Sequence, residues 1–123
     1  MTTEVAMKRL FVPLSSEPYD WFRSGLKRWE LRRYGRQYTS AHVKQGRQVE
    51  LRRGYRSQDQ ALWGRIIRTV DAASLLSFFD EVPFQLVIPV AKTREEAVAL
   101  ASSILGVAPN ETTRVLGFEI EVN

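Results

Sequence analysis

Alternation of apolar and polar residues along the chain predicts five β-strands, because successive side chains of a strand point to opposite faces. The predicted strands are residues 8–14, 27–34, 47–53, 62–70 and 114–122. The last of them alternates most clearly, with Leu116 and Phe118 on one face and Gly117 and Glu119 on the other. The strand at 62–70 is apolar on both faces, which predicts a central position in the sheet.

Three helical segments separate these strands. Serine and proline at 15–18 predict the start of a first helix, and Gly25 is placed to end it. A short apolar helix is predicted at 74–79. Residues 93–96 form a capping box, Thr-Arg-Glu-Glu, which predicts a third helix that ends at Gly106. The face that this helix is expected to bury consists of Ala97, Leu100, Ala101 and Ile104.

The order of the elements is strand, helix, several strands, helix and strand. No strand–helix–strand unit repeats, so an α+β fold with a small barrel flanked by helices fits better than a doubly wound sheet. In the third strand, Val49 and Leu51 are expected to point inward and Glu50 outward. Residues 54–59 are expected to form a polar turn. The length of 123 residues predicts a single domain over 1–123.

Composition excludes several kinds of site. The chain has no cysteine, which rules out disulfides, thiolate nucleophiles and zinc fingers. Its single histidine, His42, rules out sites with several histidines, so neither a metal nor a cofactor is expected. The longest apolar stretch is far shorter than the roughly 20 residues of a membrane span. The N-terminus lacks the pattern of a secretory signal, so a soluble, cytoplasmic protein that does not enter membranes is expected.

Basic residues are concentrated in the first half of the chain. Residues 23–68 hold thirteen basic side chains, eleven of them arginine, against three acids, which gives +10 in a chain of net charge +4. Aromatic residues are interleaved with them, namely Trp29, Tyr34, Tyr38, Tyr55 and Trp63. Arginine and aromatic side chains together are typical of nucleic-acid surfaces, since the guanidinium group matches phosphate and stacks on bases. A merely solvated basic face is the alternative.

One motif, Gly25-x-Lys27-x-x-Glu30-x-Arg32, resembles the signature of the ASCH domain, a branch of the PUA-like barrels. The resemblance continues in a glycine-containing turn at 44–47 and in the glycine of Trp63-Gly64 on a later strand. It implies a small mixed β-barrel of five to six strands, flanked by two or three helices, with a cleft beside the motif. It also implies binding of RNA or another single-stranded nucleic acid, whose base or nucleotide would enter that basic cleft.

The candidate binding residues combine the motif with nearby arginines. Glu30 and Arg32 are two positions apart, so they share a strand face and are able to pair. Lys27 has the opposite parity and reaches the same cleft only if the strand begins after it or bulges there. The predicted set consists of Gly25, Lys27, Glu30, Arg32, Arg33, Arg52, Arg53 and Arg65.

Two other functions remain open. Some members of the ASCH family hydrolyse 4-acetylcytidine or cut RNA, and in such an enzyme Lys27 and Glu30 would be catalytic. The amidohydrolases have threonine where Glu30 stands here, so that hydroxyl is missing and the carboxylate is expected to keep Lys27 protonated. A protein-interaction domain that meets an acidic partner is the third possibility. The oligomeric state is not indicated by the sequence.

Overall fold

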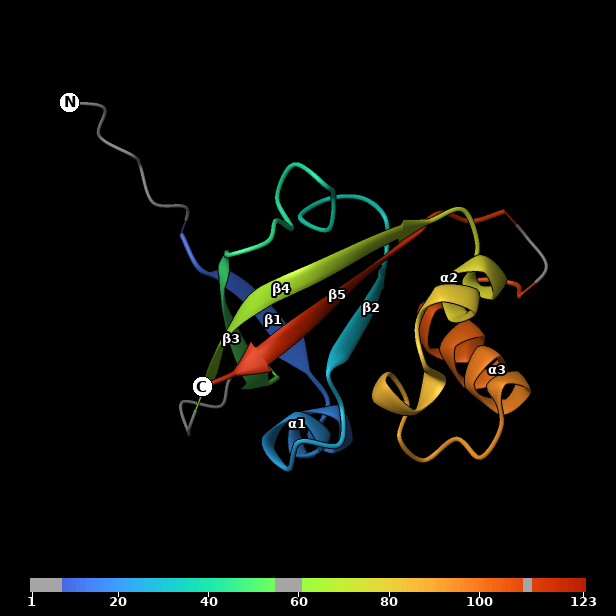
Figure 1. The fold of residues 1–123 in the computed structure, drawn as a ribbon, viewed down its shortest axis with the longest axis horizontal. Helices are drawn as coiled ribbons and strands as arrows, with labels where there is room; N and C mark the ends of the chain where they lie inside the picture. The colour runs from blue at the N-terminus through green and yellow to red at the C-terminus, as the bar shows by residue number, and fades with distance from the viewer. Residues whose placement is uncertain (1–7, 55–60, 110–111) are drawn as a thin grey trace.

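The computed structural model describes residues 8–54, 61–109 and 112–123. Five strands form one curled sheet, in the order β1-β3-β4-β5-β2, with β1 and β3 parallel and the other neighbours antiparallel (Figure 1). The strands are β1 (Leu10–Leu14), β2 (Trp29–Arg33), β3 (Gln48–Arg53), β4 (Leu62–Ala72) and β5 (Val115–Val122). The edge strands β1 and β2 share no backbone ladder within these residues. The predicted α+β class and small PUA-like barrel are therefore confirmed as a five-stranded half-barrel.

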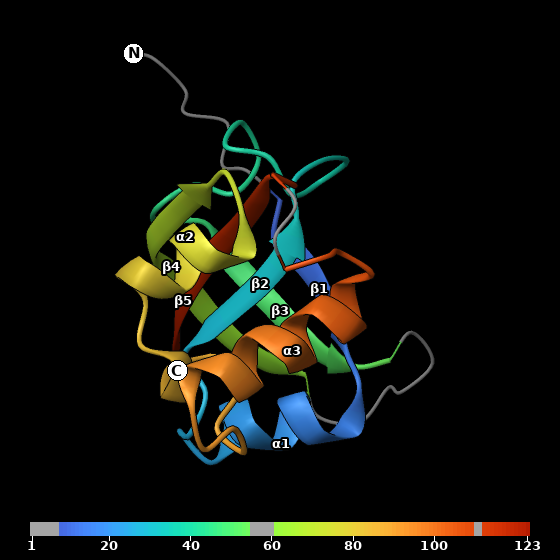
Figure 2. The ribbon, with the colours of Figure 1, turned by 90° about the vertical axis from the view of Figure 1, so that its right-hand side faces the viewer.

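The helices cover two separate parts of this half-barrel. They are α1 (Ser16–Arg23), α2 (Leu75–Glu81), the 3-10 turn η1 (Phe84–Leu86) and α3 (Arg94–Leu105). Helix α1 lies across one end of the curled sheet, whereas α2 and α3 pack together at its side (Figures 1 and 2). None of the described helices is long and apolar enough to cross a membrane.

Two apolar clusters follow from this arrangement. One fills the concave side of the sheet and includes Val12, Leu51, Phe118 and the α1 residue Phe22. The other lies between the sheet and the pair of helices α2 and α3. Gly117 is required there, because a Cβ atom at this position would lie only 2.1 Å from the ring of Phe78. The predicted central place of β4 is confirmed by its pairing with both β3 and β5.

The burial of Ile104 and Glu50 differs from what the sequence pattern alone suggests. Ile104 was expected in the core but is 74% exposed. The buried face of α3 consists of Ala97, Val98 and Ala101 instead. Glu50 points outward as expected, yet it is only 1% exposed, since arginine side chains cover it. Of the predicted turn at 54–59, only Gly54 is described, and residues 55–59 lie outside the described residues.

Candidate functional site

The end of α1 determines where the motif lies. Gly25 has a φ of +81°, a left-handed conformation that favours glycine, so the chain turns sharply after the helix. The backbone N–H groups of Leu26 and Lys27 both donate to the carbonyl of Trp21, which fixes this turn. Strand β2 then begins at Trp29. Lys27 therefore precedes the strand, which is one of the two conditions under which it reaches the cleft of Glu30.

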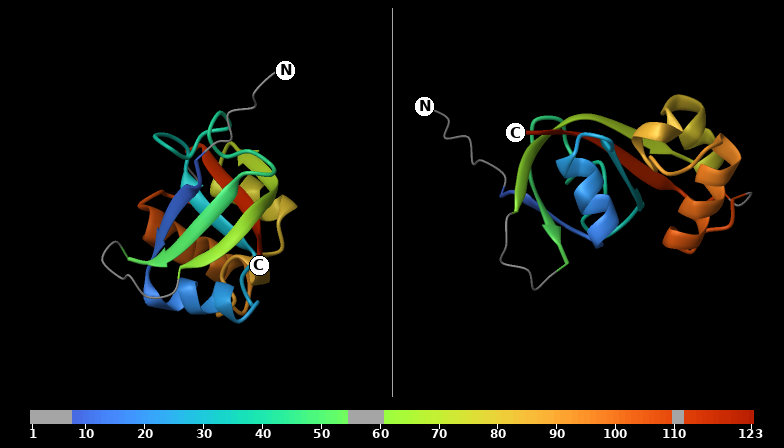
Figure 3. Two further views of the ribbon diagram at one scale, coloured as in Figure 1. Left: turned by 90° about the vertical axis from the view of Figure 1, so that its left-hand side faces the viewer. Right: turned by 90° about the horizontal axis from the view of Figure 1, so that it is seen from below.

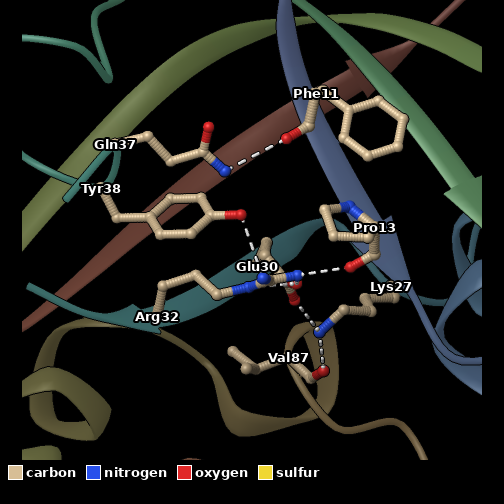
Figure 4. Close-up of polar contacts among 8 residues, drawn as sticks. All are labelled: Phe11, Pro13, Lys27, Glu30, Arg32, Gln37, Tyr38 and Val87. Carbon is tan, nitrogen blue, oxygen red and sulfur yellow. Dashed lines mark hydrogen bonds and ion pairs between the residues drawn. The ribbon is translucent and has the colours of Figure 1, made fainter. Parts of the chain in front are cut away.

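Lys27 is buried next to Glu30 (Figure 4). Its Nζ lies 3.4 Å from Oε1 of Glu30 and donates a hydrogen bond of 2.5 Å to the carbonyl oxygen of Val87, the residue after η1. The same Nζ lies 5.4 Å from the centre of the Phe22 ring. An ammonium group has three hydrogens. Among the described residues only these two oxygens accept from it, so its third hydrogen has no oxygen partner there.

Arg32 occupies the other side of Glu30. Its Nε and Nη2 donate to Oε2 of Glu30 at 2.9 and 2.5 Å, and Nη2 also donates to the carbonyl oxygen of Pro13 at 2.8 Å. Nη1 donates to the hydroxyl of Tyr38, whose ring lies under the guanidinium group. All three guanidinium nitrogens are thus engaged, so a ligand meets Arg32 as a fixed cation in the wall.

These contacts also join the two edge strands. Arg32 belongs to β2 and Pro13 to β1, so their hydrogen bond spans the opening between the edges (Figure 4). Gln37, shortly after β2, donates in the same way to the carbonyl of Phe11 at 3.3 Å. We call this opening, bridged by Arg32–Pro13 and Gln37–Phe11, the seam. Side chains close it where backbone hydrogen bonds do not.

Burial changes the acidity of the cluster. Loss of hydration lowers the pKa of the Lys27 ammonium, and the nearby Glu30 carboxylate only partly offsets this. Burial alone raises the pKa of the Glu30 carboxyl, but Lys27 and Arg32 together hold it below its usual value. Glu30 raises the pKa of Lys27, which is the direction expected from the sequence, but burial lowers this pKa by more, so that the net shift is downward. The cluster contains two cations and one carboxylate.

A pocket of about 310 Å³ opens beside this cluster. Lys27, Glu30 and Arg32 form its polar part, and its walls come from β1, α1, β2, the loop after η1, and α3. Its apolar or weakly polar lining consists of Pro13, Leu14, Ser15, Pro18, Trp21, Leu31, Val87, Ile88, Ala101, Ile104 and Leu105. The pocket therefore offers mostly apolar walls with one charged end, which is typical of ligand sites.

The other predicted binding residues lie outside the pocket. Gly25 shapes the turn that leads to Lys27, and Arg33 is exposed at the end of β2. Arg52 pairs with Glu50, whereas Arg53 bonds Asp20 on α1 at 3.1 Å. Arg65 is exposed on β4, and Tyr55 and Arg56 of the basic stretch lie outside the described residues. His42 is exposed, and no group of three metal-binding side chains occurs in the part of the chain described.

Comparisons with solved structures place the fold. The hypothetical protein PH0355 is similar over 94% of this chain and 100% of its own, with a TM-score of 0.76 and 18% identity. Protein PF0455 from Pyrococcus furiosus covers 94% of this chain and 97% of its own, with a TM-score of 0.67 and 18% identity. A variant of the ASCH protein from Zymomonas mobilis covers 94% and 70%, with a TM-score of 0.62 and 11% identity. This chain has an ASCH-type fold. No family model matches it, and a search of curated proteins finds no match.

Within this ASCH-type fold, the structure adds pocket residues that sequence reasoning missed. Val87 contributes only a backbone carbonyl, for which a sequence carries no signal. Trp21 on α1 lines the pocket half-buried, and strand parity gives no prediction for a helical residue. Ser15 brings a hydroxyl to the pocket that the motif itself lacks; its side chain makes no capping bond to α1. Ile104, whose helical position predicted burial in the core, lines the pocket instead.

Proposed function

We propose that the chain binds nucleic acid, RNA in the first place, and that the pocket takes one base or nucleotide. The observation that carries this proposal is the buried Lys27 ammonium, with one hydrogen left for a ligand at the charged end of an apolar pocket. Resemblance of the fold to an ASCH protein supports the choice of ligand class.

The shape and chemistry of the pocket suit a flat heterocycle. Its volume of about 310 Å³ is at the lower end of the range of small-molecule sites. The half-buried Trp21 and the aliphatic walls favour an aromatic ring, and Lys27 is placed to donate to a carbonyl or phosphate oxygen. A net positive cluster attracts a ligand that carries a phosphate.

Arginines outside the pocket would increase affinity without reading the base. Arg33, Arg52, Arg53 and Arg65 belong to the strongly basic stretch, and Gly25 acts only by shaping the turn. Contacts of this kind release counterions, so the affinity for a single strand should fall linearly with salt on logarithmic axes. A pocket contact should depend less on salt, because it is buried.

The test is a titration of a labelled single-stranded oligoribonucleotide, its DNA counterpart and duplex RNA at two salt concentrations. Lys27→Met should weaken RNA binding about tenfold at both salt concentrations, since a hydrogen bond to a charged group is lost. Lys44→Met removes an exposed lysine of the same basic stretch and is the matched control; its small effect should vanish at high salt. Equal behaviour of the two variants, or no binding by the wild type, would contradict the proposal.

A hydrolase that acts on RNA or on an acylated cytidine is the second candidate. Two observations favour it: burial lowers the pKa of Lys27, and Ser15 brings a hydroxyl to the same pocket. Hydrolysis of the acylated cytidine would consume one water and release cytidine and the carboxylic acid. Incubation with either substrate should then give product, and Ser15→Ala and Glu30→Gln should each abolish it with the fold retained. Intact substrate after prolonged incubation would exclude the hydrolase and leave nucleic-acid binding as the proposed function.

A further inference from the structure

The convex side of β1, β3 and β4 carries a second set of basic and aromatic groups. No described helix covers this part of the sheet, as the left panel of Figure 3 shows. Strand register aligns Phe11 of β1, Glu50 of β3 and Trp63 of β4 in one row across the strands. The inward neighbours Val49 and Leu51 lie in the core, so the row points outward. We call this side of the three strands the outer face.

Glu50 holds two arginines on the outer face. The Nε of Arg9 donates to its Oε1, and the Nε of Arg52 lies 2.6 Å from its Oε2. The Arg9 guanidinium lies over the Trp63 ring and the Arg52 guanidinium over the Phe11 ring. Arg9 bonds Glu50 and Arg52 forms an ion pair with it through Nε, and no hydrogen bond joins their terminal nitrogens to any described residue.

This arrangement prepares both guanidinium groups for an anion. Phosphate oxygens bind best to the planar fork of guanidinium donors, and the terminal nitrogens that remain form that fork. Glu50 is 1% exposed and fixes the two side chains before any ligand arrives, which lowers the entropy cost of binding. The unit of Arg9, Glu50 and Arg52 has a net positive charge, so it attracts anions.

We infer that the outer face binds the phosphodiester backbone of single-stranded nucleic acid, with Arg9 and Arg52 on phosphates and Trp63 stacked against a base. This goes beyond the pocket proposed above, although it shares the class of ligand. Trp63 is 38% exposed on a strand surface that no described helix covers, so an unpaired base is able to reach it. Arg65, exposed two residues further on β4, extends the basic surface along the same face.

The aromatic group is what favours a single strand over an acidic protein or duplex. Guanidinium groups alone attract any anion, but bases stack on exposed aromatic rings only when they are unpaired. The Arg9 guanidinium lies 5.7 Å from the centre of the Trp63 ring, so a base that contacts the exposed part of this ring also meets that cation. Duplex RNA keeps its bases stacked internally and offers phosphates alone, so it should bind the outer face more weakly.

The test removes the unit without leaving a buried charge. The triple variant Arg9→Gln/Glu50→Gln/Arg52→Gln takes away one net positive charge, and Arg36→Gln, in the loop after β2, removes the same net charge elsewhere. Binding of a fluorescein-labelled oligouridylate should weaken about tenfold in the triple variant, with a shallower salt slope. Arg36→Gln should cause only a slight loss. Trp63→Ala should also cost about tenfold through lost stacking, with less effect on duplex RNA.

Thermal unfolding shows which variants fold. If the triple variant does not fold, the double variant Arg9→Lys/Arg52→Lys tests the role of the two guanidinium groups instead. It keeps both charges but removes the guanidinium forks, so oligouridylate binding should still weaken. Equal losses in the triple variant and Arg36→Gln would overturn the inference, since they indicate a diffuse field. Unchanged binding in Trp63→Ala would overturn the single-strand assignment.

The same titration separates this inference from the pocket proposal. Free uridine carries no phosphodiester, so it tests the pocket alone and should bind the triple variant like the wild type. Loss of oligouridylate binding only in Lys27→Met would retain the pocket and reject the outer face. Loss only in the triple variant would retain the outer face and reject the pocket. A wild type that binds no oligouridylate would reject both.

Discussion

The pocket and the outer face use the same arrangement, one carboxylate between two cations, under opposite conditions of exposure. In the pocket, Lys27 and Arg32 flank Glu30, and the Lys27 side chain is only 5% exposed. On the outer face, Arg9 and Arg52 flank Glu50, and their side chains are 51% and 30% exposed. Within the buried set, Arg32 closes the seam through its bond to Pro13, whereas Lys27 contacts Glu30 and the Val87 carbonyl. In the exposed set, the terminal guanidinium nitrogens of Arg9 and Arg52 make no hydrogen bond with the described residues.

The difference shows how burial decides what a charged cluster does. Inside the pocket, Glu30, Pro13 and Tyr38 engage all three guanidinium nitrogens of Arg32, and burial lowers the pKa of Lys27. Two arginines at a surface keep more of their hydration, since the side chains of Arg9 and Arg52 stay partly exposed. We therefore expect Lys27 to bind a polar group of a ligand in the pocket. On the outer face, we expect the guanidinium forks of Arg9 and Arg52 to do so.

The largest expected effect comes from neutralising each carboxylate. Glu30→Gln leaves two cations facing each other in a buried site and should lower the free energy of unfolding by about 3 kcal/mol. Glu50→Gln should cost about 1 kcal/mol, because Arg9 and Arg52 are able to turn toward water. Urea unfolding of both variants measures the difference. Equal losses would mean that the two clusters are not distinguished by burial.

A smaller effect is expected from exchanging arginine for lysine. Arg32→Lys keeps its charge next to Glu30 but cannot reach Pro13 and Tyr38 at the same time, so the free energy of unfolding should fall by about 2 kcal/mol. Arg52→Lys should stay within about 0.5 kcal/mol of the wild type. Guanidinium chloride midpoints of the two variants give the comparison, and a larger loss in Arg52→Lys would reverse it.

The pH dependence of stability sharpens the comparison further. Lys27 has a lower pKa in the folded chain, so the unfolded chain binds its proton more tightly between that value and about 10.4. Stability of the wild type relative to Lys27→Met should therefore rise as the pH rises through that interval. A flat difference between the two proteins in urea melts from neutral to alkaline pH would contradict this.

At acidic pH both clusters behave alike. The pKa values of Glu30 and Glu50 are both below the usual value, Glu50 chiefly through its hydrogen bond from Arg9. Each therefore contributes stability above the usual glutamate pKa, which is lost as the pH falls through the lowered one. As the pH is lowered, the free energy of unfolding of Glu30→Gln and of Glu50→Gln should therefore fall less than that of the wild type. Urea unfolding at a series of acidic pH values measures this difference.

Much of the fold was accessible from the sequence, because alternation and capping are local. The capping bond from Glu96 to Thr93 and the buried row of Leu10, Val12 and Leu14 match their patterns. From the sequence, contact between Lys27 and Glu30 could be predicted only on the condition that β2 begins after Lys27 or bulges there. The alternating pattern does not fix that start, which the structure places at Trp29. The carbonyl of Val87 and the burial of Glu50 depend on contacts distant in sequence, to which local patterns are blind.

The seam has one more consequence, for association of the chain with copies of itself. An uncovered strand edge normally invites another strand to pair with it. Along the open edge of β1, however, the nitrogen of Pro13 carries no hydrogen, and the carbonyls of Phe11 and Pro13 already accept from Gln37 and Arg32. An incoming strand finds no donor at that proline and two occupied acceptors. The side chains that close the half-barrel thus also protect it from edge-to-edge aggregation.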